Sequence, residues 1–592
     1  MGNPAPPGAN NWAYGAWALF NGNGYWESPN SHVKPRSLYY AQLEHRLKFD
    51  LNARARLLIV ETNATSSPTV EQAAELTALS RQAAITLKEW IEQAPVVNPI
   101  TTGSLGVKTI DQLGIQKEKE ISSGIPMRVK NGWLVRGDRV LTGSRQSVPW
   151  WSGNIRPRGI SSAKPAITRY VPGRTGTGYT DDLEQLTDAM KNNNQIGIEQ
   201  NYGLWYERRR DDHERVRRMD GDAWPPFYEL PFARSGEGTA WDGLSKYDLT
   251  QYNPWYWQRL KQFANLADQK GLVLVHQNYF QHNILEAGAH WTDSPWRPVN
   301  NINDTGFPEP PPYAGDKRIF MDEQFYDTTH PVRRELHRAY IRQCLDNFRE
   351  NTGVIQLTSE EYTGPLHFVE FWLDVIREWE METGEQVITG LSATKDVQDA
   401  ILADPVRSQV VDVIDIRYWA YRADSSLYAP QGGQHLAPRQ HARLVSPGKR
   451  SFEQVYRAVS EYKSAHPQKA VMYSEGQYTS YGWAVFMAGG SLAAIPSVEA
   501  TGLLKSASSM YLVENPEAGV YQMQNGQGES IIYLDGEQAT ELGFQLKKGS
   551  YNLYQIDPQT GKLVGEGSKL SGIKPIRIEN KSKKPQVFWL CR

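Results

Sequence analysis

The chain has very little cysteine and almost no net charge, and these two shortages exclude several classes of protein. Only Cys344 and Cys591 occur among 592 residues, so neither a disulfide framework nor a cysteine-based metal site is expected. The net charge of -2 gives no general affinity for nucleic acid or anionic lipid. No apolar run reaches the length of a transmembrane helix. We therefore expect neither nucleic acid nor membrane as a partner.

Aromatic residues, in contrast, are abundant, with 19 Trp and 30 Tyr. Core packing of a large protein accounts for many of them. Flat aromatic faces also stack on sugar rings, and the polar tips of Tyr and Trp form hydrogen bonds. A carbohydrate site is therefore the functional alternative.

From about Lys164 onward, short apolar runs alternate with amphipathic helical stretches. Eight such alternations predict a (β/α)8 TIM barrel. An open doubly wound sheet is disfavoured because no glycine-rich phosphate loop follows any strand. The strands are predicted at Ala166–Tyr170, Ile196–Asn201, Leu272–Tyr279, Val354–Glu360, Gln386–Leu391, Val411–Tyr418, Ala470–Glu475 and Leu492–Ile495.

The barrel is predicted to lie between two other regions. Residues 1–160 form an N-terminal mixed accessory region, in which Lys130-Asn131-Gly132 predicts a hairpin turn. Residues 161–504 form the catalytic barrel, and residues 505–592, rich in period-two alternation, form a C-terminal antiparallel β-sandwich. Long segments follow the second, third and sixth barrel strands, at 202–254, 280–331 and 419–451. Loops of this length are usually functional, and these would wall a pocket on one face of the barrel.

Two predicted strands end on glutamate. In GVIQLTSEEYTGP, alternation places Ile355 and Leu357 on one face and turns Glu360 toward the barrel axis, although a twist at the strand end would present Glu361 instead. Glu475 closes the seventh strand in AVMYSEGQY. Two carboxylates on opposite sides of a barrel mouth are what glycosidic cleavage requires, one to protonate the leaving oxygen and one to attack or to activate water. A salt-bridged surface role is the alternative for either one.

Other polar side chains fall on strand faces that alternation directs toward the axis. We predict substrate contacts from Glu199, Asn201, His276, Asn278, Asp415 and Arg417. An inward Arg417 suggests a substrate carboxylate, which a guanidinium group binds through two hydrogen bonds, and a structural pair with Asp415 or a glutamate is the alternative. For His276, a buried core histidine is the alternative to a sugar contact. No histidine spacing indicates a metal site, so no metal and no cofactor are expected.

The stretch FYDTTHPVRRELHRAYIRQCLDNF (Phe325–Phe348), followed by SEEYTGPLHFVEFWLD, resembles the barrel of pectin-degrading glycoside hydrolases of the family 138 type. The end of the chain, VFWLCR, resembles the small β domains that follow such barrels. The resemblance implies a TIM-barrel α-galacturonidase acting on rhamnogalacturonan II. It implies an exo-acting enzyme that removes a terminal uronic acid.

The sequence thus predicts a retaining glycoside hydrolase, with Glu360 or Glu361 as general acid/base and Glu475 as nucleophile. The alternatives are a glycosidase for another terminal sugar, such as a neutral pentose or deoxyhexose, and a barrel that binds carbohydrate without cleaving it. A polysaccharide lyase is disfavoured because no metal cluster supports it. The partner is an oligosaccharide or polysaccharide. The opening residues MGNPAPPGANNW lack signal-peptide features, and we expect a periplasmic or secreted protein whose export signal is absent from this chain.

Overall fold

The computed structural model describes most of the chain from residue 124 onward. The described residues are 124–147, 183–200, 230–240, 245–279, 284, 291, 294–309, 321–359, 362–433, 450–475, 478–514, 517–572 and 575–592. The predicted strand Ala166–Tyr170 and the predicted site residues Asn201, Glu360 and Glu361 lie outside them. Within the described residues, no helix is both long enough and apolar enough to cross a bilayer.

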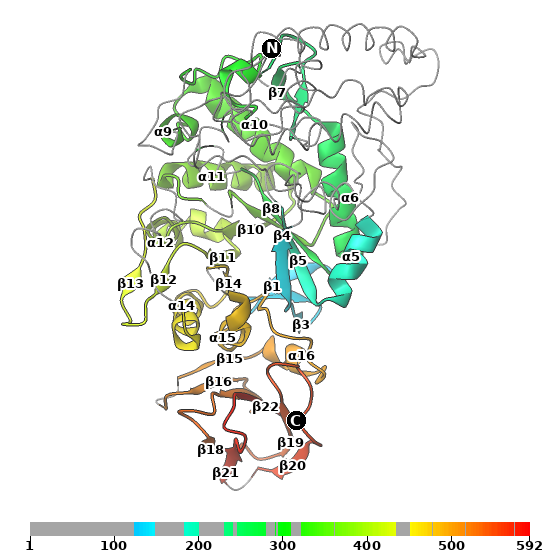
Figure 1. Ribbon diagram of the computed structural model, residues 1–592, viewed down its shortest axis with the longest axis vertical. Coiled ribbons are helices and arrows are strands. Elements are labelled where there is room, and N and C mark those ends of the chain that lie inside the picture. Colours follow the sequence, from blue (N-terminus) through cyan, green and yellow to red (C-terminus); the bar gives the residue numbers. More distant parts are fainter. Residues whose placement is uncertain are drawn as a thin grey trace, which may run out of the picture.

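A seven-stranded parallel sheet forms the centre of the molecule, in the order β14-β11-β10-β9-β8-β5-β4 (Figure 1). Its strands are β4 (Ser144–Ser147), β5 (Gln195–Gln200), β8 (Val273–Gln277), β9 (Val354–Leu357), β10 (Ile388–Leu391), β11 (Val413–Ile416) and β14 (Ala470–Tyr473). Counted from β4, β9 is the fourth strand and β14 the seventh. Helices separate successive strands along most of the chain, so the fold is mixed α/β with a parallel sheet.

The first strand of the sheet comes from a region that we predicted to be accessory. Strand β4 pairs in parallel with β5, from Ser144 opposite Gln195 to Ser147 opposite Glu199. Its sequence, SRQS, contains no apolar residue, so it carries neither the alternation nor the β-branched composition by which strands are recognised. The sheet therefore takes a strand from within residues 1–160, while the domain limits remain a prediction.

The predicted last strand, Leu492–Ile495, is an isolated parallel bridge between Ala493 and Thr142. The amide of Leu492 donates to the carbonyl of Leu141 over 2.9 Å, and the amide of Gly143 donates to the carbonyl of Ala493 over 2.8 Å. On its other side, Ser491 N donates to the carbonyl of Val471 in β14 over 2.7 Å. This segment thus contacts both β14 and the residues that lead into β4, the two edges of the sheet.

Helices cover one face of the sheet, and Figure 1 shows them around the strands. They are α5 (Leu183–Asn192), α6 (Pro254–Lys270), α10 (Pro331–Asn347), α11 (Leu366–Thr383), α12 (Lys395–Ala403), α14 (Phe452–Ala465) and α15 (Gly482–Met487). Local signals set their ends: Ser451 and Gln454 form a capping box at the start of α14, and Gly384, with φ of 71°, ends α11. Helix-facing strand residues such as Leu274, Ile414 and Val471 share one large apolar core with these helices.

The other face of the sheet encloses a second apolar cluster, here called the interior cluster. Its members are Met127, Leu134, Leu141, Val273, Val275, Ile355, Leu357, Val413, Ala470, Met472 and Leu492. Strand residues from β8 to β14 belong to it, so the sheet curves around this interior. Met127, Leu134 and Leu141 come from the segment before β4, which covers the interior at the amino ends of the strands.

That segment is a small antiparallel sheet of β1 (Met127–Lys130), β2 (Trp133–Arg136) and β3 (Arg139–Val140). The predicted hairpin turn is confirmed, because Asn131 and Gly132 both have positive φ, 51° and 71°. Lys463 of α14 holds the turn by donating to the carbonyl oxygens of Asn131 and Gly132.

The alternation predicted for β9 is reversed. Ile355 and Leu357 lie in the interior cluster, whereas the Gln356 amide faces the helices and donates to the carbonyl of Cys344 in α10 over 3.3 Å. All four residues of β9 are buried, so polarity alone did not identify the interior face. Alternation along β9 therefore does not turn Glu360 inward.

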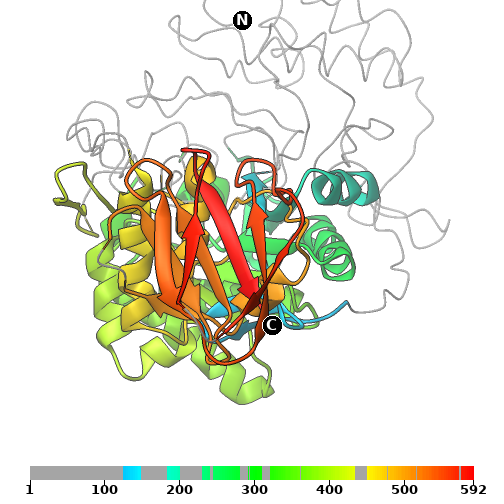
Figure 2. The ribbon, with the colours of Figure 1, turned by 90° about the horizontal axis from the view of Figure 1, so that it is seen from below.

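The C-terminal region is antiparallel, as predicted. A six-stranded sheet has the order β15-β16-β17-β22-β19-β20, and β18 pairs with β21 in a separate two-stranded sheet. Figure 2 shows the C-terminal strands, in orange and red, side by side in front of the parallel-sheet region. The strands are β15 (Tyr511–Val513), β16 (Val520–Gln524), β17 (Ser530–Leu534), β18 (Glu541–Gln545), β19 (Ser550–Ile556), β20 (Ser568–Ser571), β21 (Pro575–Glu579) and β22 (Gln586–Cys591). An apolar cluster that includes Ile532, Leu542 and Ile578 joins the larger sheet to the smaller one.

Aromatic residues join the C-terminal sheet to the parallel-sheet region. Phe452 of α14 packs 4.6 Å from the ring centroid of Tyr521 and 4.5 Å from that of Tyr533. Trp483 of α15 donates its indole N–H to the carbonyl of Pro558 over 2.8 Å. The remaining strands and α-helices of the described chain are β6 (Phe232–Arg234), β7 (Tyr247–Tyr252), β12 (Ala420–Tyr421), β13 (Leu427–Tyr428), α9 (Asp322–Phe325) and α16 (Leu503–Ala507), and the 3-10 helices are η5 (Pro298–Asn300), η6 (Arg407–Val410) and η7 (Tyr478–Tyr481).

Candidate functional site

Charged side chains gather at the carboxyl ends of the parallel strands, opposite the end covered by the hairpin. This charged cluster consists of Arg145, Glu199, Asp415, Arg417, Arg450 and Glu475. The carboxyl ends of parallel strands are where α/β folds place their binding and catalytic groups. The cluster therefore has the position expected of an active site.

Glu199 on β5 lies between two guanidinium groups. Its Oε1 is 2.8 Å from the Nη1 of Arg145 on β4 and 3.1 Å from the Nη2 of Arg417, which follows β11. Arg145 also donates to the carbonyl of Tyr473 over 3.0 Å and to the Oγ of Ser474 over 2.8 Å. These contacts connect β4, β5, β11 and β14 across the enclosed space.

Asp415 is fully buried and accepts hydrogen bonds from several directions. Ser392 donates to its Oδ2 over 2.9 Å, Ser474 donates to its Oδ1, and the Nε of Arg417 lies 3.4 Å from Oδ2. Hydrogen bonds to both of its oxygens fix the direction of this carboxylate. Asp415 thus orients Arg417, and the structural pair considered in the sequence analysis is present.

Glu475 follows β14 and pairs with Arg450, whose Nη2 lies 2.7 Å from its Oε1. Its side chain is 18% exposed. Burial raises the pKa of the Glu475 carboxyl above its ordinary value, and the neighbouring Arg450 and Arg417 oppose that shift. Burial, with help from the Glu475 charge, also raises the pKa of Tyr428 to about 12. A mostly buried carboxylate with a raised pKa at a strand end is the kind of group that active sites use.

Sequence reasoning located part of this cluster and missed the rest. Glu199, Asp415, Arg417 and Glu475 were predicted, and the structure brings them together. Arg145 was missed because its strand has no apolar pattern. Arg450, which precedes α14, was missed because a single arginine in a long loop carries no signal of its own.

The structure does not place His276 and Asn278 in this cluster, which corrects the prediction that they line the pocket. The His276 ring lies 2.8 Å from the Oε1 of Gln356 and packs against Phe348 at the end of α10. Asn278 accepts a hydrogen bond from the indole of Trp372 in α11 over 2.7 Å. Burial lowers the pKa of His276 to about 4, so it is neutral near pH 7. Both residues belong to a polar network between sheet and helices, which is the buried-core alternative for His276.

The remaining predicted residues lie outside the described part of the chain. Glu360 and Glu361 follow β9 in the sequence by a few residues, and Asn201 follows β5 directly. Their roles remain predictions. Among the described residues, no group of three or more His, Cys, Asp or Glu side chains is arranged to hold a metal ion.

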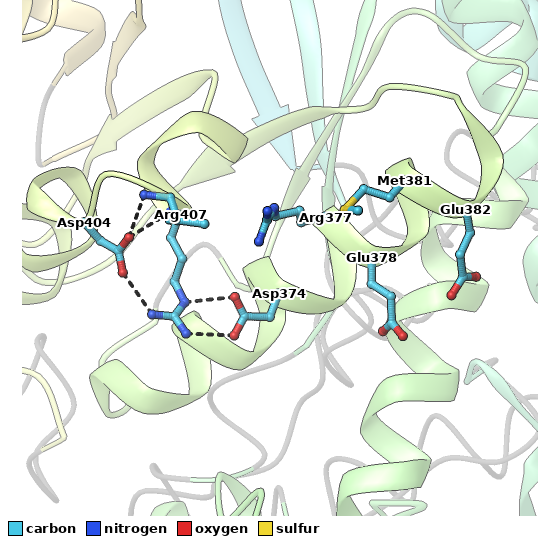
Figure 3. Close-up of a pocket in the computed structure, with 8 residues that line it drawn as sticks. Asp374, Arg377, Glu378, Met381, Glu382, Asp404 and Arg407 are labelled. Carbon is cyan, nitrogen blue, oxygen red and sulfur yellow. Dashed lines mark hydrogen bonds and ion pairs between the residues drawn. The ribbon is translucent and has the colours of Figure 1, made fainter.

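A second concave region lies on the outer surface, away from the charged cluster. It encloses about 720 Å³ beside α11 and is lined by Asp374, Arg377, Glu378, Met381, Glu382, Asp404, Val406 and Arg407 (Figure 3). Most of its charged groups are held in ion pairs: Arg407 lies 2.8 Å from Asp374 and 2.9 Å from Asp404, and Glu378 and Glu382 pair with Arg338 and Arg342 of α10. Because these carboxylates are paired on the outer surface, far from the carboxyl ends of the parallel strands, we do not assign the active site here.

Comparisons with solved structures find distant likenesses of overall fold. The chain is similar to a structure described as "Glycoside hydrolase", with a TM-score of 0.40 and 10% identity over 78% of this chain and 96% of that one. A glycoside hydrolase family 5 protein from Bacteroides vulgatus gives a TM-score of 0.40 and 10% identity over 80% and 95% of the two chains. An isomalto-dextranase from Arthrobacter globiformis gives a TM-score of 0.34 and 12% identity over 79% of this chain and 76% of that one.

No curated protein matches the chain in sequence. One family model does match, described as "Domain of unknown function (DUF6298)", and it covers residues 24–510. This range includes every strand of the parallel sheet and the whole charged cluster. The chain belongs to the DUF6298 family of domains of unknown function.

Proposed function

We propose that the protein is a glycoside hydrolase whose active site is the charged cluster. The observation that carries this proposal is Glu475, a mostly buried carboxylate with a raised pKa at the end of the seventh parallel strand. The two adjacent glutamates Glu360 and Glu361 follow the fourth strand. In a curved parallel sheet, the carboxyl ends of the fourth and seventh strands can face each other across an enclosed space, as a pair of glycosidase carboxylates must.

The finer mechanism we propose is retaining, in a sheet that closes as a (β/α)8 barrel through residues 491–495. Glu475 is the nucleophile, and Glu360 or Glu361 is the general acid/base. Arg450 supports this role because its 2.7 Å contact fixes one carboxylate oxygen of Glu475. A raised pKa makes a carboxylate a stronger base and nucleophile while it stays ionised, so activity should fall as the pH drops through that pKa.

For the substrate, we propose a terminal uronic acid, in the manner of an exo-acting α-galacturonidase on an acidic plant polysaccharide such as rhamnogalacturonan II. The guanidinium groups of Arg145, Arg417 and Arg450 support an anionic substrate. Arg417 also pairs with Glu199 and Asp415. These two carboxylates would hold its guanidinium group in place while it binds the substrate carboxylate. A neutral pentose or deoxyhexose is the alternative sugar.

Product analysis tests the proposal. The protein is incubated with rhamnogalacturonan II fragments and with aryl glycosides that include the α-galacturonide and the α-galactoside. Release of galacturonic acid supports the full proposal, and release of a neutral sugar supports the hydrolase without the uronide. Sugar binding without release favours the alternative of a binding protein with no catalysis.

The role of Arg417 is tested separately by Arg417→Ala. If Arg417 binds the uronate, kcat/KM for the α-galacturonide should fall about 10- to 100-fold more than kcat/KM for the α-galactoside, because only the uronide loses a charged partner. Arg407→Ala on the outer surface is the control and should change neither rate. Equal losses on both substrates would reduce Arg417 to a positioning group for Glu199 and Asp415.

A further inference from the structure

Gln277, the last residue of β8, combines full burial with a side chain that makes no hydrogen bond. It is 1% exposed. Within the part of the chain that the structure describes, neither its Oε1 nor its Nε2 has a hydrogen-bond partner. An unpaired buried polar atom typically costs folding free energy, and here both ends of one amide are unpaired. A bound molecule that forms hydrogen bonds with both amide atoms would explain why this residue is buried without a partner in the chain.

The side chain of Gln277 faces the interior of the curved sheet. Val273 and Val275, the preceding residues of the same parity on β8, both belong to the interior cluster. Gln277 pairs in register with Leu357 of β9, another member. On the neighbouring strand β5, Glu199 of the charged cluster lies opposite Val275, so Gln277 is one inward position closer to the carboxyl end than Glu199.

The helix-facing amides provide an internal comparison. Gln398 of α12 donates to the carbonyl oxygens of Leu391 and Asp415 and accepts from the indole of Trp419. Gln356 of β9 likewise has partners for both of its amide atoms, at Cys344 and Asn278. Other amides of the described residues, such as Asn351, leave one buried atom without a partner while the other atom is paired. Among the described residues, Gln277 is the one side-chain amide whose two atoms are both buried and unpaired, and it faces the interior near the charged cluster.

We propose that Gln277 is a sugar-binding residue of the active site, whose Oε1 accepts a hydrogen bond from one substrate hydroxyl and whose Nε2 donates to a neighbouring one. An amide has one acceptor and one donor side by side, which matches two adjacent hydroxyl groups of a pyranose ring. The substrate class is therefore a sugar with free adjacent hydroxyls at the position that Gln277 contacts. This inference rests on the proposed glycosidase function and adds a specificity-determining contact to it.

Gln277→Leu tests the proposal because stability and binding should respond in different directions. Leucine has a similar size and removes two unpaired polar atoms, so the melting temperature should stay the same or rise. Binding of galacturonic acid or galactose, measured by calorimetry, should weaken about tenfold or more, because the sugar hydroxyls lose their partners. Gln356→Leu is the matched control: it should lower the melting temperature and leave the affinity unchanged, since it removes a satisfied amide of the core.

An unchanged affinity in Gln277→Leu would overturn the proposal and would mean that the amide is hydrated by an internal water only. A loss of affinity together with a drop in melting temperature as large as that of Gln356→Leu would also overturn it, because a structural amide behaves in this way. Failure of the wild-type protein to bind either sugar would overturn it as well. Turnover of the aryl glycosides tests the glycosidase function separately: a protein that binds sugar through Gln277 without cleaving any glycoside would contradict only that function.

Discussion

At the scale of single residues, the position of a buried carboxylate determines whether its raised pKa contributes to catalysis or only lowers the stability of the fold. Glu475 and Asp412 both have raised pKa values because they are buried. Glu475 lies among arginines at the carboxyl end of the sheet. Asp412 lies just before β11, at the opposite end, where it accepts a hydrogen bond from the amide of Thr389 over 3.0 Å. Because the substrate is proposed to bind at the other end of the sheet, we expect the raised pKa of Asp412 to affect only the stability of the protein and not its activity.

The Asp412→Asn variant should be more stable than the wild type at neutral pH and equally stable at acid pH. Burial raises the pKa of Asp412 from 3.8 to about 6, so the folded state holds the proton more tightly than the unfolded state. The stability from protonated Asp412 is full below about pH 4 and is lost as the pH rises through about 6. Asparagine keeps the acceptor oxygen without the charge, and the gain at pH 8 should be about 1 to 3 kcal/mol. Thermal unfolding of the wild type and the variant at pH 4, 6 and 8 measures this gain in stability. A gain that does not depend on pH would contradict the raised pKa of Asp412.

At the scale of elements, the sequence predicted strands with apolar composition well and the interior faces only in part. Along β11 and the residue after it, the polar residues Asp415 and Arg417 alternate with Ile414 and Ile416, and the predicted faces agree with the structure. On β9 every residue is buried, so the sequence pattern could not show which of its two faces points to the interior and which to the helices. Strand β4 could not be found because its four residues are all polar. Sequence patterns thus locate an interior face only where the polar and apolar faces of a strand differ.

The hairpin turn at Asn131-Gly132 packs against Lys463, and this contact, which holds the hairpin over the amino end of the sheet, can be tested by mutation. A Cβ added at Gly132 would lie 2.1 Å from the Nζ of Lys463 and 2.3 Å from the carbonyl of Pro467. Gly132→Ala should therefore lower the stability by about 2 to 3 kcal/mol. Gly384→Ala is the control, because it has the same φ of 71° with no atom within 4 Å, and it should cost about 1 kcal/mol. Equal losses in the two variants, measured by thermal unfolding, would mean that strain alone matters and the contact with Lys463 does not.

At the scale of the whole molecule, one apolar core extends from the helices of the parallel sheet into the C-terminal sheet. Leu503 and Trp483 share that core with Met523, Ile531 and Trp589 of the C-terminal strands. The two regions differ in composition, which is why the sequence predicted a boundary near residue 505. The shared core indicates that they fold and unfold together.

Phe452→Ala tests this coupling, since Phe452 packs on Tyr521 and Tyr533 across the junction. We expect a loss of about 2 to 3 kcal/mol and a lower melting temperature of the whole protein in one transition. The exposed Met381 provides the control, and Met381→Ala should change little. A separate early transition of the C-terminal sheet, with the rest of the protein unaffected, would show that the two regions are independent.

The proposed glycosidase activity depends most on Glu475 as a catalytic carboxylate, and the hydrolysis rate of the Glu475→Gln variant tests this role most directly. On whichever aryl glycoside the wild type cleaves, the variant should lose about 10³-fold or more in kcat while keeping its melting temperature and its sugar affinity. Glu378→Gln is the control, because Glu378 pairs with Arg338 on the outer surface, and it should retain full activity. A Glu475→Gln variant that cleaves the glycoside at the wild-type rate would contradict the proposed active site.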